Sequence, residues 1–190
     1  KKNNENIYLN GNNTSSGHDW WYDMMPNIYF YQLCELYPNI GGDKDLQFIA
    51  VADQMLKAVK AMGGSDRPWS SPSMNYRAWN FQSMIPLDEG VIEPEAAGAY
   101  AWLLYNAYLH TGKKSYLNGA LWSLDFLQQL SKNPSYELQL PYGTYIAARI
   151  NAELGTEYDI QKFTTWSFDR GHLRGWGTIV GKWGGMDVSG

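Results

Sequence analysis

Hydrophobic positions recur at three- and four-residue steps along most of this chain, which is the period of an amphipathic helix. The first such stretch covers residues 20–37, and the segment 39–42 then breaks the period. A second stretch covers about 45–62 and stops at Gly63-Gly64, because glycine suits the end of a helix. These patterns predict one helical hairpin over residues 20–62.

Two further hairpins follow from the same reasoning. A helix is expected to open at Glu93-Pro94-Glu95 and to run to His110, since proline fits the first helical turn and carboxylates favour the positive end of the helix dipole. The remaining periodic stretches lie at about 114–131, 142–154 and 159–168. Each pair of helices is joined by a short turn that carries glycine. The chain is therefore predicted to be all-α, with about three hairpins.

Three segments lack the helical period. Residues 1–16 are rich in Asn, Lys, Ser and Gly and predict a linker or disordered N-terminus, which leaves 17–190 as the domain. Residues 65–92 hold several prolines and predict a long loop, a candidate wall for a cleft. Residues 169–190 are rich in glycine and predict a loop or a short hairpin.

One stretch carries a family resemblance. His110-Thr111-Gly112-Lys113-Lys114-Ser115-Tyr116-Leu117, followed by Ala120 and Leu124-Asp125-Phe126-Leu127, resembles a repeat unit of the six-hairpin glycosidases. The resemblance covers roughly residues 17–168. It implies an α/α-toroid of inner and outer helices, a scaffold that polysaccharide lyases share. It also implies an exported protein, extracellular or periplasmic.

The number of helices departs from that family. A closed toroid of six hairpins needs twice as many helices as this sequence predicts. We therefore expect a partial, incomplete toroid, most simply a fragment. The rest of its own toroid, or another chain, would then be a partner.

The amino-acid composition indicates which class of ligand the protein could bind. Aromatic residues make up 15% of the chain, with nine Trp and fourteen Tyr. Their flat apolar faces and polar edges complement sugar rings, although helical hairpins also pack on aromatic residues. A net charge of −4 without a basic block argues against a nucleic-acid partner, and no apolar run is long enough for membrane insertion.

Metal and cofactor chemistry find no support in the sequence. A lone Cys34 forms no disulfide framework, and three His residues show no metal-ligand spacing. No glycine loop has the strand-then-helix context of a phosphate site. We therefore expect no metal and no cofactor.

The resemblance places the sugar cleft at the rim that carries the N-termini of the inner helices. If the first helix of each hairpin is the inner one, this rim collects residues 18–23, 93–95, 140–142 and 169–187. Glycoside hydrolysis needs one carboxyl group as the acid and a second as the base or nucleophile. The catalytic candidates are Asp19, Glu95 and Asp187. Capping of a helix is the alternative role for Asp19, and complementing a helix dipole is the alternative for Glu95.

Candidate substrate-binding residues come from the same rim. Trp20 and Trp21 point about 100° apart on a helix, so one can pack inward while the other lines a cleft. The full set is Trp20, Trp21, Glu93, Tyr142, His172, Arg174, Trp176 and Trp183. We expect a glycoside hydrolase-like protein with paired carboxylates in an aromatic-lined cleft.

Two other functions stay open. One is a non-catalytic glycan-binding or helical scaffold protein on the same helices. The other is a polysaccharide lyase acting on a uronate, in which Tyr142 or His172 takes a proton while Arg170 and Arg174 neutralise the sugar carboxylate.

Overall fold

The computed structural model describes residues 5–11, 13–173 and 182–187, and this part of the chain is predominantly helical. Its helices are α1 (Trp20–Leu36), α2 (Lys44–Ala61), α3 (Ala96–Thr111), α4 (Lys114–Gln129), α5 (Gln139–Leu154) and α6 (Ile160–Phe168). Each lies within a few residues of a stretch where the sequence shows helical period. The all-α prediction is therefore confirmed.

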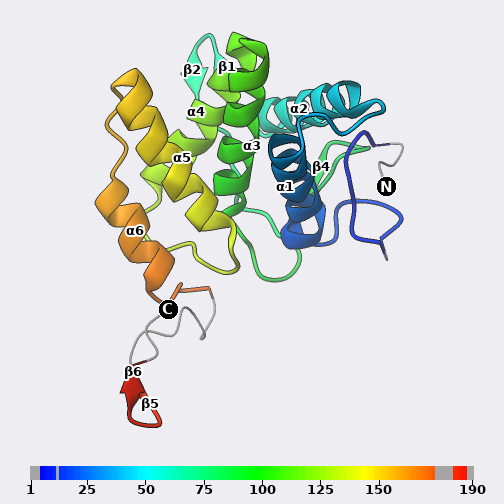
Figure 1. Ribbon diagram of the computed structural model, residues 1–190. Coiled ribbons are helices and arrows are strands. Elements are labelled where there is room, and N and C mark those ends of the chain that lie inside the picture. Colours follow the sequence, from blue (N-terminus) through cyan, green and yellow to red (C-terminus); the bar gives the residue numbers. More distant parts are fainter. Residues whose placement is uncertain (1–4, 12, 174–181, 188–190) are drawn as a thin grey trace.

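Helix α3 is the centre of the structure. It packs against α1 on one side and α5 on the other, and it also contacts α2 and α4 (Figure 1). Its residues from Ala96 to Tyr105 are all buried. A helix that is apolar all round belongs in a core, and α3 satisfies this rule.

Two glycines set the distance between α3 and α5. A Cβ atom at Gly98 would lie 2.4 Å from the carbonyl oxygen of Gln139, and one at Gly143 would lie 2.7 Å from the Gly98 Cα. Real Cβ atoms do not approach other atoms so closely. The backbones of the two helices are therefore in contact at this point, and only glycine fits there.

The helix ends follow local chemistry. Asp19 accepts a hydrogen bond from the Trp21 backbone N–H at 2.8 Å and caps α1, and Asp159 does the same for Lys162 at the start of α6. Gly112 and Gly155 end α3 and α5 in the left-handed conformation, each with φ of 69°. The glycine turns that the sequence predicted are thus real helix stops.

The long segment 65–92 is more ordered than a loop. It forms two short antiparallel pairs, β1 (Ser65–Asp66) with β2 (Trp69–Ser70) and β3 (Ala78–Asn80) with β4 (Ile85–Leu87). Its Met74, Trp79 and Phe81 side chains are buried in the core. Burial of these side chains anchors the segment onto the helices.

The N-terminal prediction needs a correction for residues 5–11 and 13–16. Ile7 is fully buried in the core, and the Tyr8 backbone exchanges hydrogen bonds with the Asn27 side chain at 2.8 and 2.9 Å. Glu5 accepts hydrogen bonds from Ser16, which fixes both ends of this stretch. A few apolar residues in a polar composition are enough to anchor the segment.

The glycine-rich tail contains β5 (Lys182–Trp183) and β6 (Met186–Asp187), which form the short hairpin that was one of the two predicted outcomes. In the described part of the chain, no helix combines the length and apolar character needed to cross a membrane.

Candidate functional site

The predicted rim brings Asp19 and Glu93 together through Arg77. The two ends of the Arg77 guanidinium each form an ion pair, one with Asp19 and one with Glu93. The Glu93 side chain is completely buried, whereas Asp19 is 16% exposed. One cation therefore joins the starts of α1 and α3 to the segment that leads into β3.

Glu95 lies at the same rim but faces the protein interior. It is fully buried and accepts hydrogen bonds from the backbone N–H groups of Glu137 and Leu140. These donors belong to the first turn of α5 and the residues just before it, so the carboxylate caps the neighbouring helix. These contacts are those of a structural residue, and a catalytic role for Glu95 stays a prediction.

The adjacent Trp20 and Trp21 take different environments, as their helical spacing predicts. Trp20 is fully buried, donates from Nε1 to the Tyr76 carbonyl at 3.0 Å and meets Tyr100 edge to face at 5.6 Å. Trp21 is half-buried at the edge of the core. Trp20 therefore belongs to the core, and only Trp21 retains a surface for a ligand.

The C-terminal candidates that the structure describes differ in position, since His172 lies beside this rim and the β5–β6 hairpin does not. His172 is exposed, its Nδ1 lies 2.6 Å from the Asn133 carbonyl oxygen, and it lines a small cavity with Ile92 and Pro94 beside the start of α3. Asp187 is exposed on β6 and Trp183 lies in β5, and Figure 1 draws this hairpin apart from the starts of α1, α3 and α5. The predictions for Arg174 and Trp176 fall outside the described residues.

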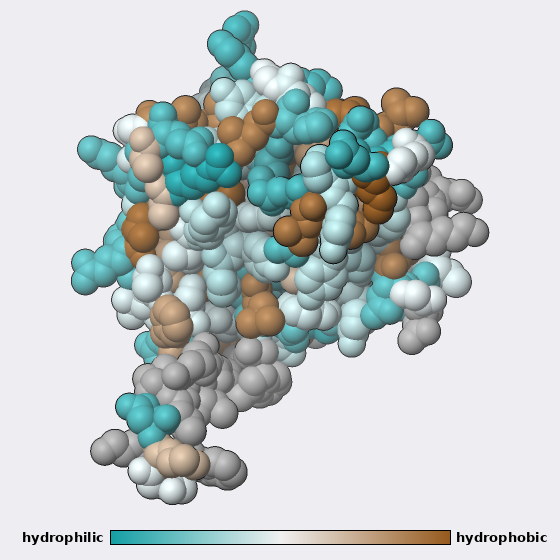
Figure 2. All heavy atoms as spheres, in the orientation of Figure 1, coloured by the Kyte–Doolittle hydropathy of each residue, from teal (hydrophilic) through white to brown (hydrophobic). Residues whose placement is uncertain are grey.

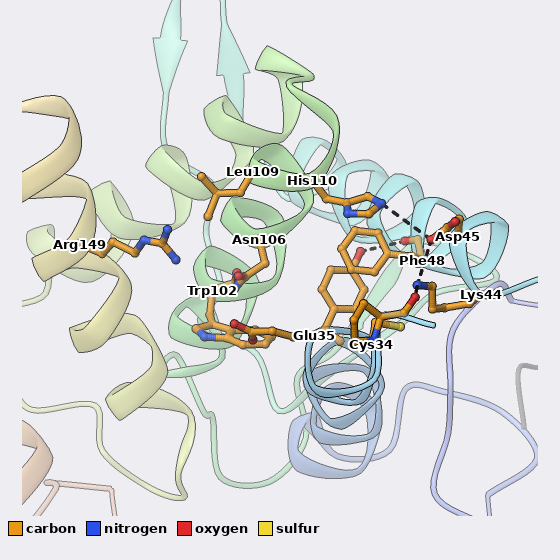
Figure 3. A pocket seen from close by; sticks show the side chains of 12 residues that line it. Cys34, Glu35, Lys44, Asp45, Phe48, Trp102, Asn106, Leu109, His110 and Arg149 are labelled. Carbon is orange, nitrogen blue, oxygen red and sulfur yellow. Dashed lines mark hydrogen bonds and ion pairs between the residues drawn. The ribbon is translucent and has the colours of Figure 1, made fainter. Parts of the chain in front are cut away.

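A cavity of about 390 Å³ lies elsewhere, on the face built by α1, α3 and α5 with the start of α2 (Figure 3). This volume is in the range of sites for small ligands. Trp102, Asn106, Leu109 and His110 line it from α3, at the spacing of one helix face. We take this cavity as the candidate functional site.

Aromatic rings run along the cavity. Tyr31 stacks on Phe48 at 3.8 Å between ring centroids, and Phe48 lies 4.8 Å from the His110 ring. Trp102 is 6.4 Å from Tyr31 and meets Tyr142 edge to face at 5.6 Å. Tyr142, a predicted binding residue, reaches this face through its contact with Trp102, and burial raises the pKa of its hydroxyl while the Gln32 side chain opposes the rise.

Polar groups surround these rings. Asp45 lies 3.6 Å from the Lys44 ammonium and 3.9 Å from His110 Nε2. Arg149 donates from Nε to Glu153 at 2.5 Å, and Figure 3 shows its side chain directed from α5 toward the cavity. Asn106 adds an amide beside Trp102. The cavity therefore offers hydrogen-bond donors and acceptors around an aromatic floor.

Two titratable side chains of the cavity stay neutral near neutral pH. Burial raises the pKa of Tyr31 well above its usual value, and burial also raises the pKa of the Cys34 thiol. A thiol acts as a nucleophile through its thiolate form, which a raised pKa disfavours. Covalent catalysis by Cys34 is therefore disfavoured.

The surrounding surface has a mixed character. Figure 2 shows pale residues of intermediate hydropathy, the class that includes Tyr and Trp, over the middle of this face, with strongly polar and strongly apolar residues above them. Among the described residues no group of three or more His, Cys, Asp or Glu is placed to hold a metal ion.

Comparison of the chain with protein-family models, with curated proteins and with solved structures gave no match in any of the three. The function therefore has to be inferred from the cavity and its side chains.

Reasoning from the sequence missed most of this cavity. It placed the site at the N-terminal ends of α1, α3 and α5 and in the C-terminal tail, where several carboxylates and Trp residues cluster in the sequence. One signal did exist, because Asn106 is a polar residue in an otherwise apolar helix and shares a face with Trp102 and His110. The contributions of Lys44, Asp45 and Arg149 depend on how the hairpins pack, which no local pattern shows.

Proposed function

We propose that this chain is a carbohydrate-active protein of the glycoside hydrolase type, which binds a short segment of a glycan in the cavity between α1, α3 and α5. One observation carries the proposal. A single cavity combines the rings of Tyr31, Phe48 and Trp102 with amide, carboxylate and guanidinium groups. A sugar ring presents the matching surfaces, an apolar C–H face and a rim of hydroxyl groups.

The proposed architecture is a partial α/α-toroid in which α1, α3 and α5 are the inner helices. The position of α3 between α1 and α5 supports this arrangement. The other hairpins would come from the rest of the same protein or from another chain. Export from the cell is proposed by resemblance to the six-hairpin glycosidases alone.

Hydrolysis of a glycosidic bond would need two carboxyl groups. Glu35 and Asp45 line the cavity, whereas Asp19, Glu95 and Asp187, the candidates predicted from the sequence, are not part of its wall. Release of reducing ends by the wild type, and its loss in the amide variant of each carboxylate, would assign the pair. A variant that loses turnover but still binds the glycan identifies a catalytic residue.

Non-catalytic glycan binding is the second candidate. It is favoured by the contacts of the predicted catalytic residues, since Asp19 is paired with Arg77 and Glu95 caps α5. Binding of an oligosaccharide without any release of products would support this function over hydrolysis.

The direct test is titration of the protein with oligosaccharides of defined linkage, followed by calorimetry and by Trp fluorescence. Asn106→Ala is the diagnostic variant, and we expect about tenfold weaker binding because one hydrogen bond to the sugar is lost. Asn118→Ala, on α4 and away from the cavity, is the control and should bind as the wild type does. The proposal fails if no glycan binds, or if both variants bind alike.

A further inference from the structure

The charges that line the cavity are unevenly compensated. Besides Tyr31 and Cys34, which stay neutral, five ionisable side chains contribute to its wall, namely Glu35, Lys44, Asp45, His110 and Arg149. Four of them have a partner of opposite charge or a partner that can carry one. The exception is Glu35, at the end of α1.

The two cationic side chains of the cavity wall, Lys44 and Arg149, each have a carboxylate partner. The Lys44 ammonium donates to the Pro38 carbonyl at 2.6 Å and lies 3.6 Å from Asp45. Arg149 is held by Glu153, whose second carboxylate oxygen accepts from the Tyr105 hydroxyl at 2.5 Å. Each cation is therefore already compensated by a carboxylate.

Glu35 is different, because its side chain makes no hydrogen bond or ion pair with any residue of the described chain. Its exposed side chain extends from α1 toward the side of the cavity where Trp102 lies (Figure 3). The described cavity wall thus carries one uncompensated negative charge, on Glu35, and also the indole of Trp102. Carboxylates and aromatic faces both attract cations.

We propose that the glycan bound here carries a cationic amino group, as in a glucosamine-type sugar, with Glu35 as the residue that selects it. This inference rests on the proposed function and narrows its substrate class. The amino group of the sugar supplies the cationic partner that Glu35 lacks, while the sugar ring lies against the aromatic side chains. A uronate would instead add a second negative charge beside Glu35, while Lys44 and Arg149 of the cavity wall each already have a carboxylate partner.

The test compares three oligosaccharides that share a β-1,4 backbone and differ at carbon 2 of the sugar. Chitosan oligosaccharides carry an ammonium group there, chitin oligosaccharides an acetamide and cello-oligosaccharides a hydroxyl. Calorimetry at mildly acidic pH should give about three- to tenfold tighter binding of the chitosan form, the size expected for one partly exposed ion pair with a cation–π contact. Added salt should reduce this preference.

The Glu35→Gln variant should lose the preference and keep its affinity for the neutral cello-oligosaccharide. Glu89→Gln, which removes the same charge far from the cavity, should keep the preference. Equal binding of all three sugars, or an unchanged preference in Glu35→Gln, overturns the inference while the glycan-binding function stands. Absence of binding by all three sugars and by glycans of other linkage overturns both.

Discussion

Arg77 and Glu93 form an ion pair in which the carboxylate has no contact with solvent. The same guanidinium pairs with Asp19, which is far away in the sequence. The second Glu93 oxygen, Oε2, is buried and has no hydrogen-bond partner among the described residues. Glu93 therefore depends on Arg77 for compensation of its charge.

Replacement of Arg77 tests this dependence. Arg77→Met should lower the free energy of unfolding by about 3 kcal/mol, because it leaves a buried carboxylate without a cation. Adding Glu93→Gln should recover a substantial part of that loss, since a neutral amide costs less to bury. Urea denaturation of the two variants provides the measurement. Equal stability of the single and double variants would contradict the role given to the pair.

Glu95 is predicted to contribute to stability through its hydrogen bonds to α5. Glu95→Gln should lower the free energy of unfolding by about 1–3 kcal/mol, because a charge-assisted acceptor of two backbone N–H groups becomes a neutral one. Amide hydrogen exchange should accelerate at Glu137 and Leu140. If stability and exchange stay unchanged while turnover is lost, Glu95 acts on the substrate instead.

Because α3 packs closely on α5, we expect a substitution at Gly98 to lower the free energy of unfolding strongly. Gly98→Ala should destabilise the protein by about 2 kcal/mol or more, since the new Cβ would meet the Gln139 backbone, which cannot move aside. Gly119→Ala is the matched comparison. Its Cβ would meet the ends of Leu104 and Leu56, flexible groups that can rotate, and alanine also favours the helix.

We therefore expect Gly119→Ala to change stability by less than about 1 kcal/mol. Thermal unfolding followed by circular dichroism separates the two cases. A similar loss of stability in both variants would show that the backbone contact between α3 and α5 has no special cost.

The buried Asp23 carboxyl group should make the free energy of unfolding depend on pH. Burial raises its pKa to about 7 from an ordinary value of 3.8, with the Asp19 and Glu5 carboxylates acting in the same direction and the Gly17 N–H opposing them. The folded state therefore holds this proton more tightly than the unfolded state. The resulting stabilisation is complete below about pH 4 and is lost as the pH rises through about 7.

Asp23→Asn removes the titration and keeps an oxygen that can accept from the Gly17 N–H. Between about pH 5 and pH 8 the wild type should lose stability relative to this variant, by at most about 3 kcal/mol. Guanidinium denaturation across this range measures the difference. Asp88→Asn, at an exposed position, should follow the wild type. If the free energy of unfolding depends on pH in the same way in Asp23→Asn and in the wild type, the raised pKa of the buried Asp23 carboxyl is wrong.

Local patterns accounted for the helices of this protein and for their ends. Apolar residues at helical spacing, glycine at the turns and Asp19 as a cap act between neighbours in the chain, so one sequence suffices to find them. The same local view assigned residues 5–16 to a linker, because it could not show that Ile7 would find a place in the core.

Tertiary structure decided what each carboxylate does. Asp19, Glu93 and Glu95 looked equivalent as acidic residues near helix starts. Contacts with distant parts of the chain instead give Asp19 a mostly buried ion pair, Glu93 a fully buried one and Glu95 the role of a helix cap. The cavity is also a product of packing, since its wall combines the end of α1, the start of α2 and the facing sides of α3 and α5. The sequence determines which face of each helix is apolar. How those faces pack in the tertiary structure determines which polar side chains remain at the cavity wall, where a ligand can reach them.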